Sequence, residues 1–531
     1  MDISNRLKAT LTAKAWEEVG IYNHHGIDLP LASIWTTKSA GIGEFLDLLP
    51  VIDYCSTLKL DILQLLPLND SGLDQSPYNA ISSMALHPIY LSLHALPSPS
   101  TRLKRDLEFL GRFNQSKTIL YPQVLCGKLK WLHSYIETNK TAIIEAPNYQ
   151  SFIRKNEWLL DYALFKVLKK KHNNKVWNEW DIEEKESDSA QRSRLYHTYS
   201  SEVEFHLIVQ YLCAMQLKRV SKYARERGVF LYGDIPILVS PDSVDVWTHK
   251  KLFDLTHVAG SPPNPFDPNG QCWNLPTYNW QAMEEDNFRW WRKRIEHASQ
   301  YFHIYRLDHI LGFFRIWAMP SGATPDRGHF IPSQPDTMKR QGRKLLKILI
   351  ECSNMLPIGE DLGDPPPFVR ECMEEYGIPG TKIFRYYRRW KIDRSFIPYG
   401  EYSPITISSV SSHDLDTLPL WWKHCPEEAA DYAAFKGWSY YPRLTKKQHF
   451  NILWDNHHSG SLFHVNLLQE YLSLVPDLTW ENSEDERINI PGTESKFNWN
   501  YRYKYPLNLL LTDARLKEVF RKLLKDVRLS P

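Results

Sequence analysis

The sequence predicts an α/β fold in which strands and helices alternate to form a (β/α)8 TIM barrel with inserted subdomains, including a helical insertion. Short apolar runs recur along the chain, polar, Gly or Pro residues follow each run, and helical patterns separate the runs. Strands that alternate with helices favour a parallel sheet with helical crossovers. In such a barrel, polar residues at the carboxyl ends of the strands carry the chemistry.

The predicted strands share one pattern, an apolar run that ends in a polar cluster containing an acidic residue. An open doubly wound sheet is the competing geometry, but the glycine-rich phosphate turn G-x-G-x-x-G of such sheets is missing from the sequence. The runs are Leu60–Leu66, Val229–Leu231, Phe302–Ile304, Met355–Ile358 and Ile405–Val410.

We interpret residues 1–531 as a single catalytic barrel domain. Helical periodicity marks the segments between the predicted strands. In Phe205–Arg227 apolar residues recur at steps of three and four, and Gly228 offers a stop. Residues 97–204 carry long helical patterns and charge runs, such as Lys169–Lys171, that are typical of solvated faces. They predict a helical insertion on the barrel.

Two further segments stand out. Residues 255–285 include the proline-rich stretch Ala259–Trp280, and so long an irregular segment predicts an active-site loop region. Apolar residues between Leu516 and Val527 fall on one helical face, which predicts a C-terminal helix within 511–531 that packs on the body.

The composition excludes several classes of protein. Of 531 residues, 43% are hydrophobic and 24% charged, so the chain can bury a core. The formal net charge of +2 gives no reason to expect nucleic acid or an anionic membrane as a partner. Seven scattered cysteines without a C-x-x-C pair suit a reducing compartment. With neither a signal peptide nor a membrane-spanning run, we expect a cytoplasmic protein, and no feature predicts its oligomeric state.

Three acidic residues at strand ends form the strongest candidate site. Asp308, Glu360 and Asp414 each follow an apolar run, so they are expected to converge on one rim of the barrel. Cleavage of a glycosidic bond uses such a set of acidic groups: one carboxylate attacks the anomeric carbon and a protonated carboxyl group donates a proton to the leaving oxygen. A third acid can stabilise positive charge on the ring. Arg306 lies on the same strand face as Asp308 and would hold it ionised.

Other interpretations of these residues exist. Single acidic residues often cap helices or pair with arginines on a surface, although the joint occurrence at three strand ends favours a site. His309 and His413 beside Asp308 and Asp414 could also form a metal site, but no spacing such as H-E-x-x-H appears. The sequence therefore predicts no metal.

Aromatic residues are abundant, with 19 Trp, 28 Tyr and 22 Phe. Sugar rings present flat C–H faces, so aromatic side chains can serve as platforms for them, although most aromatic residues belong to a core. Tyr78 and Trp273 lie in irregular polar segments and are therefore candidates for sugar contact. Stacking on nucleic acid bases uses the same physics, but the neutral charge balance argues against it.

Several motifs together resemble one known family of enzymes. The segment Tyr305–Arg315, YRLDHILGFFR, looks like the nucleophile strand of the 4-α-glucanotransferases, the amylomaltase or disproportionating-enzyme family. Ile358–Gly363, IGEDLG, resembles the acid/base segment of that family. Further matches, which extend the resemblance from Gly26 to Arg502, are Ser76–Tyr78, Gly233–Ile237, Asp242–Trp247, Ala259–Pro263, Pro379–Gly380, Pro491–Thr493 and Asn498–Trp499.

The resemblance implies retaining transfer of α-1,4-glucan segments between maltooligosaccharides through a covalent glycosyl-enzyme. By motif position, Asp308 would be the nucleophile, Glu360 the general acid/base and Asp414 the transition-state stabiliser. Maltooligosaccharides and α-glucans are the implied partners, and no cofactor is needed because carboxyl groups handle both charges. The implied substrate-binding residues are Ser76, Tyr78, Asp234, Gln271, Trp273, Arg306, His309, Asp361 and His413.

The chain departs from the family pattern in three places. Ser412–Thr417 reads SHDLDT where many members have THDNDT, with the histidine and the key acid kept. Trp273–Pro276 reads WNLP where many members have WGNP, and Pro265 replaces a common tyrosine. With Leu311–Trp317, these changes resemble the cytosolic, plant-type branch, here without its N-terminal starch-binding modules. Two alternatives stay open: an α-1,4-glucan hydrolase that uses the same carboxylates, and a non-catalytic glucan-binding protein.

Overall fold

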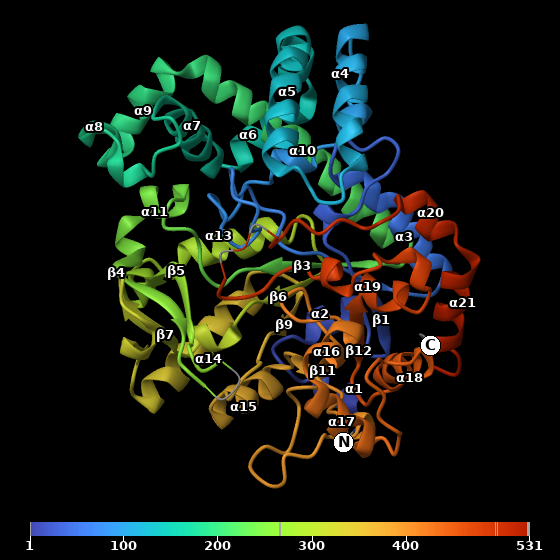
Figure 1. The fold of residues 1–531 in the computed structure, drawn as a ribbon. Helices are drawn as coiled ribbons and strands as arrows, with labels where there is room; N and C mark the ends of the chain where they lie inside the picture. Colours follow the sequence, from blue (N-terminus) through green and yellow to red (C-terminus); the bar gives the residue numbers. More distant parts are fainter. Residues whose placement is uncertain (1, 265–266, 494, 496, 528–531) are drawn as a thin grey trace.

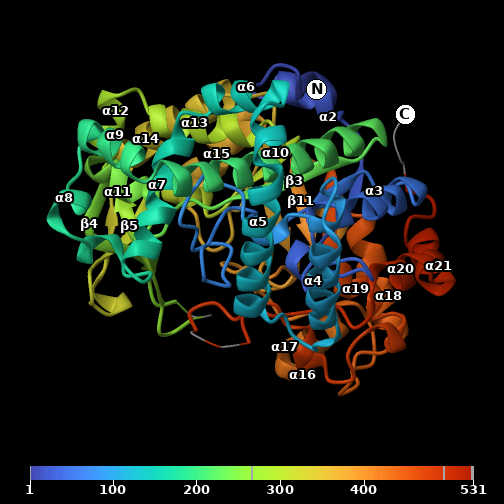
Figure 2. The ribbon, with the colours of Figure 1, turned by 90° about the horizontal axis from the view of Figure 1, so that it is seen from above.

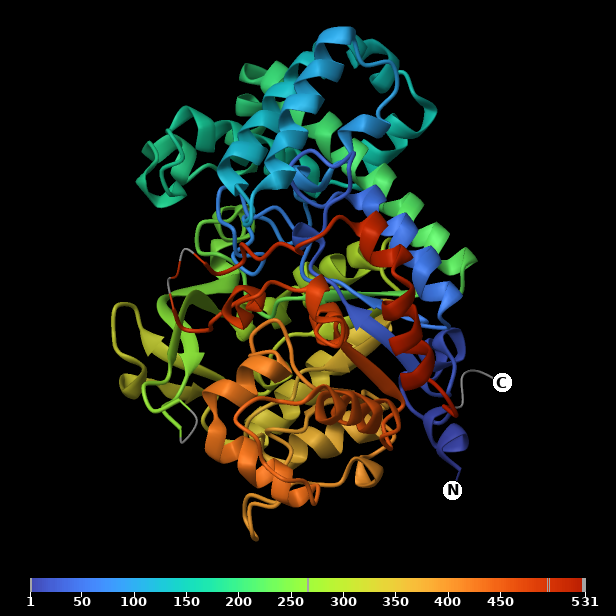
Figure 3. The same cartoon turned by 45° about the vertical axis from the view of Figure 1, so that its right-hand side comes forward.

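Parallel strands close into a barrel at the centre of the molecule. The structure is a computed structural model that describes residues 2–264, 267–493, 495 and 497–527. Within these residues eight strands form the barrel, and helices surround it, which confirms the predicted fold (Figures 1 and 3). In order around the barrel the strands are β1 (His24–Asp28), β12 (Phe463–Leu467), β11 (Thr406–Ser409), β10 (Gly380–Ile383), β9 (Leu356–Gly359), β6 (Ile304–Leu307), β3 (Phe230–Ile235) and β2 (Ile62–Gln64).

The sequence predicted five of these strands and missed β1, β10 and β12. The missed strands place polar side chains inside the protein: His25 and His464 are fully buried, and Lys382 is only 7% exposed. Apolar runs mark a strand only when its buried positions are apolar, so these three segments carried no recognisable strand signal.

A helical insertion fills the connection between β2 and β3, as expected for residues 97–204. Its helices gather at one end of the molecule, at the top of Figure 1. The last of them overlaps the predicted Phe205–Arg227 helix and ends before Gly228, whose φ of +69° is readily adopted by glycine. The helices are α4 (Thr101–Gly111), α5 (Tyr121–Ile144), α6 (Pro147–Lys155), α7 (Trp158–Lys171), α8 (Ile182–Lys185), α9 (Ser189–Thr198) and α10 (Ser200–Glu226).

The segment that was predicted to be a loop, 255–285, contains two strands instead. They belong to an antiparallel sheet in the order β5-β4-β7-β8, which lies beside the barrel (Figure 2). Proline within a strand removes a hydrogen-bond donor, and here Pro276 pairs with Val258 between two register shifts. Pro276 therefore marks an irregular strand pair. The strands are β4 (Phe253–Ser261), β5 (Gln271–Tyr278), β7 (Ile316–Pro320) and β8 (His329–Ile331).

The C-terminal segment packs on the body on the opposite side from that sheet (Figure 2). The predicted 511–531 helix is found as α21 (Ala514–Leu523), preceded by α20 (Leu507–Thr512); residues 528–531 lie outside the described residues. Leu516, Phe520 and Leu523 are fully buried, as the apolar face predicted.

The remaining helices cover the barrel or precede its first strand. None of the described helices is long and apolar enough to cross a bilayer. They are α1 (Ile3–Leu7), α2 (Ala13–Val19), α3 (Leu48–Thr57), α11 (Val244–Thr248), α12 (Trp280–Glu285), α13 (Arg289–Ala298), α14 (Pro335–Glu351), α15 (Pro367–Tyr376), α16 (Leu418–His424), α17 (Pro426–Phe435), α18 (Lys446–His457) and α19 (Leu468–Leu472).

Three buried histidines meet where β1, β12 and α18 come together. Nδ1 of His25 lies 2.9 Å from Nδ1 of His457, and the rings of His25 and His464 stack with centroids 4.6 Å apart. Burial lowers the pKa of His464 to about 4 and lowers the pKa values of His25 and His457 well below the ordinary value. The folded chain therefore keeps this cluster neutral.

This cluster predicts a loss of stability in acid. Below an unfolded pKa of about 6.5 the unfolded chain binds protons that the folded chain does not, so stability falls as the pH falls toward 4. For His464 the loss in the free energy of unfolding between pH 7 and pH 5 is about 2 kcal/mol. We expect His464→Gln to flatten the pH dependence of the urea midpoint, and the exposed His197→Gln to leave it unchanged. Equal slopes for wild type and His464→Gln would contradict the assignment.

Candidate active site

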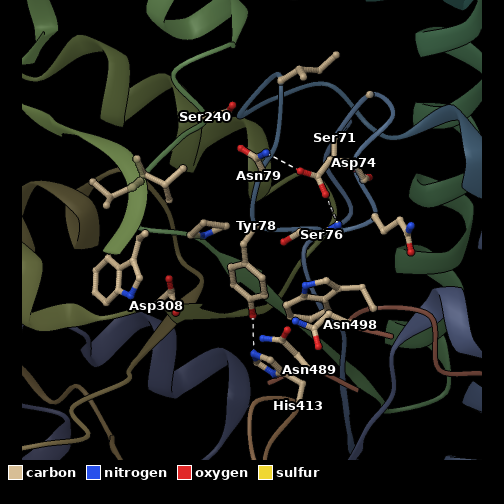
Figure 4. Close-up of a pocket in the computed structure, with 18 of the residues that line it drawn as sticks. Ser71, Asp74, Ser76, Tyr78, Asn79, Ser240, Asp308, His413, Asn489 and Asn498 are labelled. Carbon is tan, nitrogen blue, oxygen red and sulfur yellow. Dashed lines mark hydrogen bonds between the residues drawn. The ribbon is translucent and has the colours of Figure 1, made fainter. Parts of the chain in front are cut away.

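A cleft opens at the carboxyl ends of the barrel strands and gathers the three predicted acids. Its volume is about 1860 Å³, and Asp308, Glu360 and Asp414 all line it. Asp308 follows β6, Glu360 follows β9 and Asp414 lies beyond β11. Figure 4 shows Asp308 on one side of Tyr78 and His413 below its hydroxyl. The convergence expected from the sequence therefore exists in the fold.

One guanidinium group connects the carboxylates. Nη1 of Arg306 lies 2.9 Å from Oδ1 of Asp308 and 2.8 Å from Oδ2 of Asp234. Nη2 of the same side chain lies 3.9 Å from Oε2 of Glu360. Because one rigid planar group contacts all three, the carboxyl groups of Asp308 and Glu360 are held close together at the floor of the cleft.

The surroundings of Glu360 favour its protonated form. Burial raises the pKa of Glu360 to about 7, and the negative charge of Asp308 adds to this rise while Arg306 opposes it. Backbone N–H groups of His309 and Leu362 donate to its two oxygens at 2.9 and 3.0 Å, and these hydrogen bonds, like Arg306, favour the ionised form without outweighing burial. His309 reaches this position through a left-handed backbone, with φ of 45°, which strains a non-glycine residue and directs its N–H at Glu360.

The third acid, Asp414, has the opposite environment. Burial alone would raise its pKa, but His413 and the amide of Asn489 outweigh burial and lower the pKa to about 2. Nδ2 of Asn489 donates to Oδ1 of Asp414 at 2.7 Å, and Nε2 of His413 lies 3.3 Å from Oδ2. Asp414 is therefore ionised at neutral pH, as a group that stabilises positive charge must be.

Tyr78 joins the two sides of the site. Its hydroxyl donates to Oδ2 of Asp234 at 2.6 Å. The same hydroxyl lies 2.9 Å from Nε2 of His413 (Figure 4). The ring of Tyr78 also stacks on that of His413, and Trp499 lies 5.5 Å from it. This arrangement places a flat aromatic face in the cleft, next to the ionised Asp414.

The other predicted sugar-contacting residues divide into two groups. Ser76, Gln271, Trp273 and His309 line the cleft, and the Trp273 and His309 rings meet edge to face with centroids 5.0 Å apart.

Asp234 and Asp361 were expected to contact sugar. Neither belongs to the described residues that line the cleft. Asp234 binds Tyr78 and Arg306. Asp361 is 1% exposed because Lys382 and Arg370 each contact it at 3.0 Å.

One departure from the family pattern falls in the irregular sheet. Trp273–Pro276 forms part of β5, and Asn274 there has a φ of 56° in the left-handed region. Glycine adopts that region freely and asparagine does so more readily than most residues, so WNLP keeps the backbone turn that WGNP would allow. Pro265 lies outside the described residues.

A possible three-ligand metal cluster lies elsewhere in the chain. Among the described residues, His172, Asp181 and Glu184 place potential ligand atoms close together in the helical insertion. Glu184 there already accepts from Lys171 at 2.6 Å. At the cleft, His413 contacts Asp414 and Tyr78, and Asp414 accepts from Asn489.

The sequence analysis gave no site role to three residues of the site. Trp499 was noted only within the matching motif Asn498–Trp499, and Asn489 was not noted, because both come from a long irregular segment after β12 where no strand end marks them as candidates. Asp28 ends β1 and lines the cleft; burial raises its pKa to about 7. It was missed because β1 itself was missed, and an acid that closely follows two histidines and a glycine gives no strand-end signal.

A (β/α)8 barrel with two carboxyl groups on one arginine and an ionised third acid defines an enzyme that acts on glycosidic bonds. A family profile described as 4-alpha-glucanotransferase matches residues 29–508. A 4-alpha-glucanotransferase of Chlamydia caviae is 40% identical over 518 residues, which cover 96% of this chain and 97% of that protein. The chain therefore belongs to the 4-alpha-glucanotransferase family.

More distant relatives agree with this assignment. The rice protein 4-alpha-glucanotransferase DPE2 is 27% identical, with 94% of this chain and 69% of the rice protein covered. The solved structure of an amylomaltase from Streptococcus agalactiae in complex with acarbose has a TM-score of 0.77 at 22% identity and covers 95% of this chain and 99% of its own. An amylomaltase from Corynebacterium glutamicum has a TM-score of 0.78 at 19% identity, covering 96% of this chain and 76% of its own. These structures share the fold.

The environment of Glu360 predicts a carboxyl group that titrates near neutrality. In carbon-13 NMR of protein labelled at glutamate Cδ, we expect a titration with a pKa of about 7 that Glu360→Gln removes. Because Arg306 opposes the rise, Arg306→Gln should move this pKa upward.

Glu486 provides the internal control for that titration. Burial also raises its pKa to about 7, but its neighbours are Tyr501 and Trp480, and Arg306 is not among the groups that influence it. Its titration should stay in place in Arg306→Gln. A Glu360 titration that remains near that of an exposed glutamate would refute the assigned environment.

Proposed function

We propose that this chain transfers α-1,4-glucan segments between maltooligosaccharides by a retaining double displacement. In this proposal Asp308 is the nucleophile, Glu360 the general acid and base, and Asp414 the transition-state stabiliser. The observation that carries the proposal is the contact of one arginine with both Asp308 and Glu360, at 2.9 and 3.9 Å, at the floor of a cleft. Retaining enzymes need two closely placed carboxyl groups, one ionised and one protonated.

In the first half-reaction the Asp308 carboxylate attacks C1 of the donor glucan. Glu360, whose pKa of about 7 keeps it substantially protonated near neutrality, gives its proton to the departing 4-oxygen. Positive charge develops on the sugar ring as the bond breaks, and the ionised Asp414 stabilises it. The shortened glucan leaves, and the glycosyl unit is bound to Asp308.

In the second half-reaction Glu360 acts as a base. It takes the proton of the 4-hydroxyl of an acceptor glucan, whose oxygen attacks C1 and displaces Asp308. The arginine holds the released carboxylate at the position it occupied before the reaction. Tyr78, Trp273, Gln271, His309 and Ser76, which line the cleft, are proposed to contact the sugars.

We also propose that residues 1–531 form one catalytic domain that works in the cytoplasm. The helical insertion contributes α5, α7 and α10 to the same cleft that the barrel opens, which supports a single unit. All seven cysteines are free thiols, and three of them are buried, as suits a reducing compartment.

Removing the acid/base tests the assigned roles. We expect Glu360→Gln to lower transfer by about 10²–10⁴-fold, the usual contribution of general acid–base catalysis. Circular dichroism and the melting temperature check that the fold is intact. Glu401→Gln, an exposed glutamate outside the cleft, is the control for loss of a carboxylate. Near-normal turnover in Glu360→Gln would refute the assignment.

Incubation with maltotriose separates transfer from hydrolysis. Because transfer replaces one glucosidic bond with another, we expect glucose and longer oligomers at a constant number of reducing ends. Reducing ends that rise with time would indicate water as the acceptor and a hydrolase. Absence of glucose release would indicate a glucan-binding protein without catalysis.

A further inference from the structure

The cleft extends beyond the catalytic carboxylates to the helical insertion. In Figure 4, Ser71, Asp74 and Ser240 lie on the opposite side of Tyr78 from His413. We call this part of the cleft, which the mechanism leaves unused, the insertion chamber. It is the region lined from the insertion by Lys130, His133, Lys166, Lys169, Lys170 and His206.

Two helices direct basic faces at the insertion chamber. Lys130 and His133 are three residues apart on α5, and Lys166 and Lys170 are four apart on α7, so each pair lies on one side of its helix. The sequence had suggested that the Lys169–Lys171 run is a solvated face. In the structure Lys169 and Lys170 line the cleft, and only Lys171 turns away to pair with Glu184.

The lysines differ in whether their charge is compensated. Lys166 pairs with the buried Asp70 at 2.9 Å, and Lys169 pairs with Asp242 at 2.5 Å. Lys130 and Lys170 are exposed to the cleft, and neither has a hydrogen bond or ion pair within the described part of the chain. Two cationic groups in the chamber are therefore available to a ligand.

The acidic groups of the lining are bound within their own surroundings and not to Lys130 or Lys170. Asp74 accepts from the amide of Asn79 at 2.6 Å and from the backbone of Ser76, which hold its carboxylate within its own loop, and Asp242 is engaged by Lys169. From the insertion itself, Glu202 at the start of α10 is the carboxylate that joins the lining among the described residues.

The histidines report the sign of the local potential. Burial is the main cause that lowers the pKa of His206 to about 3, and the charges of Lys166 and Lys170 contribute to this lowering against the opposing charge of Asp70. Burial and Lys170 also lower the pKa of His133, which is only partly offset by Glu137. Both rings are neutral at pH 7, and the His133 ring stacks on Phe205 at 3.7 Å, forming a flat platform beside the lysines.

We propose that the insertion chamber binds a phosphate monoester carried by a glucan, with Lys130 and Lys170 as its cationic ligands. A phosphate monoester carries a charge of about −1.5 to −2 and strong acceptor oxygens, which matches two free ammonium groups. The chamber is continuous with the catalytic cleft, so a chain that reaches Asp308 can place its ester there. The inference rests on the proposed binding of glucan in this cleft.

Matched donors test the inference. Initial transfer rates are measured with neutral maltoheptaose and with maltoheptaose carrying one phosphate monoester at a 6-hydroxyl. We expect KM of wild type to be about tenfold lower for the phosphorylated donor, as two charge-assisted contacts allow. The preference should weaken as salt is added, because exposed charges are screened.

Variants locate the ester. In Lys130→Gln/Lys170→Gln the two KM values should become equal, whereas Lys130→Arg/Lys170→Arg should keep a preference. Lys175→Gln, which removes an exposed charge near α7 but outside the cleft lining, should behave as wild type. Transfer between neutral oligomers should be unchanged in all variants, because none of these residues lies at the catalytic groups.

The outcomes are distinguishable. Equal KM values for the two donors in wild type, or a preference that survives in Lys130→Gln/Lys170→Gln, would overturn the inference while leaving neutral transfer intact. Inorganic phosphate and glucose 6-phosphate serve as competitors. If either binds at the two lysines while the KM for the phosphorylated glucan is no lower than that for the neutral glucan, the ligand is a free phosphate compound and the proposal of a glucan ester is wrong. Failure of wild type to transfer neutral maltoheptaose would instead refute the proposed function.

Discussion

The arrangement of the cleft depends on the side chain of Arg306. It is 13% exposed and contacts three carboxyl groups, one within the neighbouring strand β3 and two that follow the ends of β6 and β9. Removing one partner from such a buried ionic group leaves the rest uncompensated and costs about 3–5 kcal/mol. Coulomb attraction falls with distance, so Arg306 attracts Asp308, with which it pairs directly, more strongly than it attracts Glu360. At Glu360, 3.9 Å from the guanidinium group, burial has the larger effect on the pKa. One cation thus contacts two carboxyl groups, of which Asp308 must be ionised and Glu360 protonated in the proposed reaction.

The rest of the site is assembled from distant parts of the chain around this group. Tyr78 arrives from the loop after β2, and Asn489 and Trp499 arrive from the segment after β12. Each contacts a residue of the barrel rim: Tyr78 binds Asp234 and His413, and Asn489 binds Asp414. The late segment therefore fixes the ionised acid, and the early loop fixes the aromatic platform.

The sequence predicted the barrel and the three acids because both produce local signals, apolar runs and acids at their ends. It did not reveal β1 or β12, since His25 and His464 fill interior positions with polar groups. The proline-rich stretch was read as a loop because bulged strand pairing leaves no regular alternation. Asp361 shares its motif with Glu360, yet only the fold shows that Lys382 and Arg370 occupy its oxygens. Asn489 depends on a contact across 75 residues of chain, which no local pattern contains.

The position of the helical insertion has an evolutionary consequence. All of α4 to α10 occupies the single crossover between β2 and β3, so the strands that carry Arg306, Glu360 and Asp414 are continuous without it. Substitutions on the cleft-facing sides of α5 and α7 can accumulate while bond-making residues stay under separate selection. Members of such a lineage are free to diversify in the molecules they accept and to retain one chemistry.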